Sequence, residues 1–189
     1  MKHFLMAVLL STVSIAGHAE LISNVPLVSG YASMPLSGLQ AAAQQGNVQA
    51  QFYLANRYKN GEGVPQDLNQ AFAWYKKAAE QGAAPAQLNV GQMYAQGRGV
   101  NRDMAQAKVW LQKAAKQGDN RASYNLALLE EREQNLSDAY KWYDVSTREG
   151  MLDANVKDKA QGKIRQLAAN LSPQDQQDAR QKADRWMQQ

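Results

Sequence analysis

The sequence predicts an all-α protein built from repeated helix pairs. The first observation is an internal repeat: a shift of 36 residues places 47–82 over 83–118 with fifteen identical residues. The second is that apolar residues in each repeat recur every three or four positions, as on one face of a helix. The third is a Gly-x-Gly segment that separates two such stretches in each repeat. Together these features predict a solenoid in which stacked repeats share a continuous core.

Each complete repeat predicts two helices with recognisable ends. In the first repeat, the first helix covers about 48–59, and the glycine-containing segment 60–65 ends it. Asp67 precedes the second helix and Gln70 follows three residues later, a spacing typical of a capping box. Gly82 comes directly after the second helix, where a glycine commonly terminates it. The equivalent residues of the second repeat are Asp103, Gln106 and Gly118.

Incomplete units flank the two complete repeats within 39–150. Residues 119–150 form a shortened third repeat, and its four missing residues come out of the connecting loop, so we expect a tighter turn between two retained helices. Residues 39–46 match the end of a second helix, one period before the first repeat. Residues 151–189 predict two amphipathic helices, the second introduced by Ser172 and Pro173. We interpret this last pair as the C-terminal cap that a solenoid needs.

The N-terminal region predicts an exported protein. Lys2, an apolar run and the small-x-small end Gly17-His18-Ala19 indicate a signal peptide over 1–19, cleaved after Ala19. The apolar run is shorter than the ~20 residues of a membrane-spanning helix, so no stable membrane insertion is expected after cleavage. A periplasmic location is expected, with full secretion as the alternative. Residues 20–38, uncharged from Leu21 onward, are interpreted as a linker, or else as an extended strand against the solenoid or a partner.

Composition argues against most enzyme classes. The 189 residues contain no cysteine, and both histidines lie within the predicted signal peptide. A mature chain without these residues excludes serine–histidine triads, histidine-bound zinc and thiol catalysis. The net charge is +4, and the 21 basic residues are scattered among 17 acidic ones, which does not indicate nucleic-acid binding. We therefore predict no catalytic residue, no metal and no cofactor.

The repeats resemble the Sel-one-like repeat, a relative of the tetratricopeptide repeat. The resemblance depends on the shared alanines, the loop-proximal tyrosine, the Gly-x-Gly-Val loop, the capping aspartate and the tryptophan of the second helix. Departures are the shortened third loop and Ala55, where the family prefers the glycine found at Gly91. The resemblance implies a right-handed α/α superhelix that acts as a scaffold for protein contacts. In bacteria such proteins are often exported and serve envelope assembly, signalling or host interaction.

Three other patterns have a structural and a functional interpretation. Trp74, Trp110 and Trp142 share one register on the apolar stripe, so we predict inter-helix core and not a ligand platform. The Gly-x-Gly loops follow no strand, which favours turns over phosphate cradles. The acidic cluster at 130–133 is expected to be a solvated helix face, with an acid–base pair or a weak divalent-ion site as the alternatives.

The resemblance also suggests where a partner binds, because first helices line the concave groove of tetratricopeptide-like solenoids. A helical wheel with Ala50 on the packed side directs Phe52, Tyr53 and Asn56 away from it, and their counterparts in the later repeats likewise. Of these residues, Phe52, Leu88 and Tyr124 are expected to be buried between repeats. The partner-binding residues that this nominates are Tyr53, Asn56, Asn89, Gln92, Asn125 and Leu128. Asparagine side chains offer donors and acceptors to a peptide backbone, so the predicted partner is a protein or peptide.

Two other function classes remain open at this point. One is a cell-wall enzyme, acting on peptidoglycan or a β-lactam with two carboxylates, or an accessory subunit of such an enzyme. The other is a purely structural oligomer, because the sequence does not determine the oligomeric state or the identity of a partner.

Overall fold

The computed structural model describes residues 30–148 and 154–188; the predicted signal peptide lies outside these ranges. The described part consists of α-helices joined by loops, without a β-strand. None of these helices is both long and apolar enough to cross a membrane. The helices are α2 (Leu36–Gln44), α3 (Val48–Asn60), α4 (Leu68–Glu80), α5 (Ala84–Gln96), α6 (Met104–Ala115), α7 (Asn120–Arg132), α8 (Leu136–Arg148), α9 (Ala154–Ala168) and α10 (Pro173–Met187).

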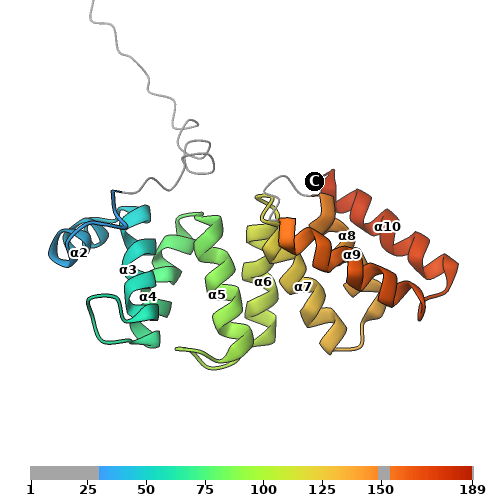
Figure 1. Cartoon of the computed structure of the whole chain (residues 1–189), viewed down its shortest axis with the longest axis horizontal. Helices are drawn as coiled ribbons and strands as arrows, with labels where there is room; N and C mark the ends of the chain where they lie inside the picture. The colour runs from blue at the N-terminus through green and yellow to red at the C-terminus, as the bar shows by residue number, and fades with distance from the viewer. Residues whose placement is uncertain (1–29, 149–153, 189) are drawn as a thin grey trace, which may run out of the picture.

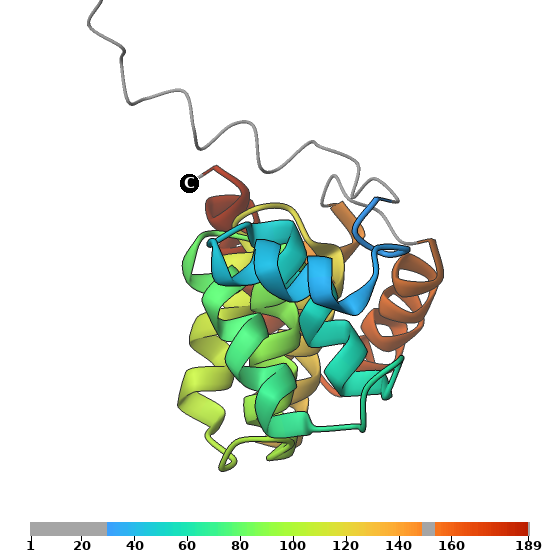
Figure 2. The same ribbon diagram turned by 90° about the vertical axis from the view of Figure 1, so that its left-hand side faces the viewer.

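The helices follow one another along the long axis of the molecule, from α2 at one end to α10 at the other (Figure 1). The pairs α3–α4, α5–α6 and α7–α8 correspond to the three predicted repeats, and each pair packs against the next. The predicted half unit is α2, which packs on α3; Figure 2 shows these two helices in front of the later ones. The predicted all-α repeat solenoid is therefore confirmed.

The predicted caps form at the start of both complete second helices. Asp67 Oδ1 accepts a hydrogen bond from the Gln70 backbone N–H at 3.0 Å, and Asp103 does the same for Gln106 at 2.9 Å. The Asp67 backbone N–H donates to the Tyr58 carbonyl oxygen at 2.9 Å, so it needs no glutamine side chain as an acceptor. One aspartate thus starts α4 with its side chain and closes the loop onto α3 with its backbone.

In the two complete repeats, the loop between the paired helices begins in a left-handed backbone conformation. Gly61 (φ 76°) and Gly97 (φ 68°) occupy the C-cap positions of α3 and α5, where glycine avoids the steric penalty of a side chain. The third loop has no glycine and consists of 133–135 alone, with Gln134 at φ 64°. The expected tighter turn is confirmed, and a residue with a Cβ makes it.

The alanine at position 55 has a packing explanation. Its counterpart in the second repeat is Gly91, and a Cβ on Gly91 would lie 2.7 Å from Leu111 Cγ. The residue equivalent to Leu111 in the first repeat is Tyr75, and both Ala55 and Tyr75 are fully buried in one cluster. A leucine branched at Cγ therefore requires glycine opposite, whereas the flat tyrosine ring leaves space for a methyl group.

Residues ahead of α2 pack onto the first repeat. The guanidinium of Arg57 in α3 donates to the carbonyl oxygens of Ala32 at 3.0 Å and Met34 at 2.7 Å. Tyr31 and Met34 also contact the core cluster around α2 and α3. Since α2 itself begins at Leu36, the part of the predicted linker from residue 30 onward belongs structurally to the solenoid.

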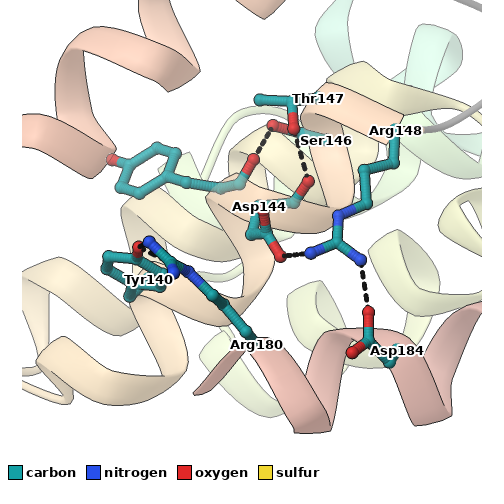
Figure 3. Close-up of polar contacts among 8 residues, drawn as sticks. Tyr140, Asp144, Ser146, Thr147, Arg148, Arg180 and Asp184 are labelled. Atoms are coloured by element: carbon teal, nitrogen blue, oxygen red, sulfur yellow. Dashed lines mark hydrogen bonds and ion pairs between the residues drawn. The ribbon is translucent and has the colours of Figure 1, made fainter. Parts of the chain in front are cut away.

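The two predicted C-terminal helices, α9 and α10, both pack against α8, and their role as a cap stays a prediction. Figure 3 shows polar contacts of α8 and α10: Arg148 pairs with Asp144 on its own helix and with Asp184 on α10. The Trp186 ring meets Trp142 edge-to-face with 4.8 Å between the ring centroids. Trp186 is half-buried and Met187 is 44% exposed, so the predicted apolar stripe of α10 is only partly covered.

Candidate binding groove

The six residues predicted to bind a partner lie on α3, α5 and α7, the first helices of the three repeats. All six are partly exposed, whereas Ala50 and Leu54 on the other side of α3 are fully buried. We call the side of α3, α5 and α7 that carries the six residues the first-helix face. Sequence periodicity thus separated the packed side from the exposed side, and partner binding at this face stays a prediction.

Two asparagines on this face have the same local geometry one repeat apart. Asn89 Nδ2 donates to the Pro85 carbonyl oxygen at 2.8 Å, and Asn125 Nδ2 donates to the Arg121 carbonyl oxygen at 2.7 Å. Each bond spans one helical turn and holds the amide in place. One N–H of each amide remains, which could bond a peptide carbonyl.

Three of the other predicted residues also serve the fold. Asn56 Oδ1 accepts a hydrogen bond from the Tyr75 hydroxyl, so this acceptor is engaged within the repeat. The Tyr53 ring meets Phe52 edge-to-face at 5.7 Å, and Leu128 packs against the C-terminal core cluster. The structure brings these three residues to the first-helix face but not into one site.

A hollow of about 120 Å³ lies between the end of α3 and α5, and it contains two of the predicted residues, Asn89 and Gln92. Sequence reasoning missed the two basic residues beside them, Lys59 at the end of α3 and Arg98 in the loop after α5. Lys59 Nζ donates to Asn89 Oδ1 at 3.1 Å and so connects α3 to α5. The remaining lining residues are Leu68, Met93 and Gln96.

Electrostatics make this hollow basic. Partial burial of Lys59 and the charge of Arg98 together lower the pKa of the Lys59 ammonium group. The sequence signal for this pair is a difference between the repeats. The second repeat has Ala95 at the position of Lys59, and the first repeat has Glu62 at the position of Arg98. A comparison between repeats therefore identifies residues that a search for shared residues overlooks.

The acidic cluster at 130–133 is not the solvated face expected from the sequence. Lys108 Nζ lies 2.9 Å from Glu130 and 2.7 Å from Glu133, which ties α6 to α7. Glu131 accepts from Lys163 at 2.8 Å and from the Tyr143 hydroxyl at 2.6 Å. Basic and phenolic groups on neighbouring helices, far away in sequence, convert the cluster into inter-helix connections.

These contacts also set the protonation of Glu131. Burial alone would raise the pKa of its carboxyl group, but the hydrogen bonds from Lys163 and Tyr143 outweigh burial and lower that pKa. A carboxyl held ionised in this way is poorly suited to act as a general acid. Among the described residues, no group of three or more acidic, histidine or cysteine side chains could hold a metal ion.

The repeated tryptophans pack as predicted in two of three cases. Trp110 and Trp142 are 7% and 3% exposed, whereas Trp74 is half-buried. A lysine Nζ lies over each indole, at a distance from the ring centroid of 3.9 Å for Trp74, 4.1 Å for Trp110 and 4.0 Å for Trp142. Each of the three indoles thus makes a cation–π contact with a lysine.

Comparisons with known proteins agree with this architecture. The family model described as the Sel1 repeat matches residues 48–82, 84–119 and 120–150, together more than half of the chain. A Sel1 repeat protein from Oxalobacter formigenes, solved by crystallography, is 36% identical over 67% of this chain and 97% of that one, with a TM-score of 0.55.

Two further solved structures are more distant. A protective antigen of uropathogenic Escherichia coli strains, which displays an SLR fold, is 27% identical over 81% of this chain and 40% of that chain, with a TM-score of 0.49. Cysteine rich protein B of Helicobacter pylori is 28% identical over 46% of this chain and 65% of that chain, with a TM-score of 0.44. No curated protein matches the sequence.

Proposed function

Because this chain belongs to the Sel1 repeat family, we propose that it is an exported, non-enzymatic scaffold that binds another protein or a peptide in the cell envelope. Sel1 repeat proteins are generally scaffolds for protein interactions. The proposed binding surface is the first-helix face, which would form the concave side of the superhelix. No observation favours a hydrolase, since the carboxylates of the acidic cluster serve as inter-helix ion pairs.

The observation that carries the proposal is the matched pair Asn89 and Asn125. Both amides are held by a carbonyl oxygen one turn earlier, and both are partly exposed at equivalent positions of successive repeats. Two oriented amides one repeat apart suit an extended chain, whose backbone groups also recur along its length. Pre-oriented side chains lose little entropy when a partner binds, which favours affinity.

Export is supported by the N-terminal sequence alone. Lys2, the apolar run that follows and Gly17-His18-Ala19 have the order of a secretory signal peptide. The proposed location is the periplasm, with secretion as the alternative. N-terminal sequencing of the protein from cell fractions tests this: a mature start at Glu20 in the periplasm is expected, and a chain retaining Met1 in the cytoplasm would contradict it.

Site-specific photo-crosslinking tests the binding surface. A photoreactive amino acid replaces Asn125 on α7 in one strain and Gln112 on α6 in another, and mass spectrometry identifies the adducts. We expect one dominant adduct from position 125 and none from position 112, because the second helices face away from the proposed groove.

Quantitative binding then follows with the identified partner. The Asn89→Ala/Asn125→Ala double variant should fold normally and lose about 0.5–1.5 kcal/mol per neutral hydrogen bond. The matched control, Lys76→Ala/Gln112→Ala, should bind as the unchanged protein does. If the control pair abolishes binding and the asparagine pair does not, the partner uses the second-helix side and the assignment is wrong.

A further inference from the structure

The hollow on the first-helix face contains two cations and no acidic residue. Lys59 and Arg98 both line it, and within the described part of the chain neither forms an ion pair. Glu62 is close in sequence, but its carboxylate accepts a hydrogen bond from Asn60 at 2.7 Å. Burial and the like charge of Arg98 lower the pKa of the Lys59 ammonium group. Its contacts are the hydrogen bond to Asn89 and the Tyr75 ring, whose centroid lies 5.9 Å from Nζ, and neither is with an acidic group.

The fold itself does not require this basic pair. Ala95 replaces Lys59 in the next repeat, and Glu62 stands in the first repeat where Arg98 stands in the second. The junction between α5 and α7 therefore lacks the pair, because it has Ala95 and a shortened loop. Of the junctions α3–α5 and α5–α7, only the first has both cations. Since other repeats have different residues at these two positions, the pair indicates a role specific to this site.

We propose that this hollow binds the side-chain carboxylate of an aspartate or glutamate in the partner polypeptide, an inference that rests on the proposed function. Lys59 Nζ uses one of its three N–H groups for Asn89 at 3.1 Å, which leaves donors for a carboxylate oxygen. Arg98 offers a planar pair of donors suited to the same group. Leu68 and Met93 supply an apolar wall for the methylene groups beside the carboxylate.

The dimensions and position of the hollow agree with one side chain of a longer ligand. Its volume of about 120 Å³ is small, and Asn89 belongs to both the hollow and the asparagine pair. A peptide held by the first-helix face would therefore place one of its side chains next to the two cations. Charge complementarity favours an acidic side chain over a neutral or basic one.

Nuclear magnetic resonance titration of the whole protein with two capped peptides tests this. The probes are Ac-Ala-Ala-Glu-Ala-Ala-NH₂ and its glutamine counterpart, with free acetate and inorganic phosphate as separate arms. The glutamate peptide should shift the side-chain amide signals of Asn89 and Gln92 and raise the pKa of Lys59. The glutamine peptide should bind at least about tenfold more weakly, the loss expected for a charge-assisted hydrogen bond.

The fold itself offers variants with little structural risk. Lys59→Ala and Arg98→Glu introduce the residues already present at the equivalent positions, and each should weaken the glutamate peptide by about tenfold or more. Arg102→Gln, which introduces the equivalent residue of the first repeat, removes a nearby charge outside the hollow and should change nothing.

Each contrary result has a definite meaning. The inference is overturned if the glutamate peptide does not bind, or if the glutamine peptide or both charge variants bind equally well. Acetate binding as tightly as the glutamate peptide, or phosphate binding more tightly, would show a small-anion site instead. Cross-linking from position 125 does not involve the hollow. A positive cross-link with a negative peptide titration therefore refutes only the carboxylate inference. A negative cross-link with a positive titration refutes the proposed binding surface.

Discussion

Replacing Gly99 with alanine should destabilise the protein much more than the same change at Gly63. The two glycines occupy equivalent loop positions in successive repeats and have nearly the same backbone, with φ of 70° and 73°. The left-handed conformation costs an L-residue about 1–2 kcal/mol at either position. The difference between the two variants therefore measures the surroundings alone.

The surroundings differ sharply. A Cβ on Gly99 would lie 2.1 Å from the Leu68 carbonyl oxygen, whereas on Gly63 the nearest atom is Arg57 Nη1 at 3.7 Å. The first distance is about 1.3 Å short of the 3.4 Å at which ordinary contact begins, and the atom in the way is backbone. Overpacking of this kind adds about 1–3 kcal/mol. We expect a loss of about 1–2 kcal/mol for Gly63→Ala and about 2–5 kcal/mol for Gly99→Ala.

Urea unfolding followed by tryptophan fluorescence and far-ultraviolet circular dichroism measures both losses. Two probes are needed because a repeat array can unfold in stages. The loop of Gly99 also carries Arg98 and rests on Leu68, so Gly99→Ala should weaken the glutamate peptide while Gly63→Ala does not. Equal unfolding free energies for the two variants would refute the close approach of this loop to α4.

Three further changes test other parts of the structure. Gln87→Ala should lower the free energy of unfolding by about 1–3 kcal/mol, because this buried amide donates to the Ala79 carbonyl oxygen and accepts from Gln117. Ser123→Ala at the equivalent position of the next repeat should be neutral or slightly stabilising, since the buried Ser123 hydroxyl has no hydrogen-bond partner among the described residues. The urea midpoints of the two variants test this difference. Glu131 has a lowered pKa in the folded state, so its contribution to stability is fully present above the ordinary pKa of 4.5 and is lost as the pH falls through the folded pKa. Glu131→Gln should therefore make the free energy of unfolding depend less on pH in the acid range. An unchanged pH dependence would contradict the assignment. Trp186→Ala should lower the free energy of unfolding by about 1–3 kcal/mol, less than the loss at a fully buried tryptophan. Deletion from Leu171 onward should cause aggregation, which size-exclusion chromatography detects. A stable monomeric deletion variant would refute the capping role.

The sequence alone determined the helices and their order, because the signals for them are local. The 36-residue period, the apolar spacing and the capping aspartates Asp67 and Asp103 act within a few residues of each helix end. Even the shortened third repeat could be anticipated, since removing loop residues leaves both helical stripes intact. Periodicity also identified the exposed side of the first helices, which includes Asn89 and Asn125.

The tertiary structure decided which side chains meet across repeats. Lys59 and Arg98 line one hollow only when the repeat α5–α6 packs against the repeat α3–α4, and Glu131 meets Lys163 only when α9 packs beside α7. Such pairs leave no periodic signal, because each partner lies at a position where the repeat tolerates several residues. The packing of one repeat on the next sets the distances between such side chains. A site formed between repeats can therefore be recognised only from the tertiary structure.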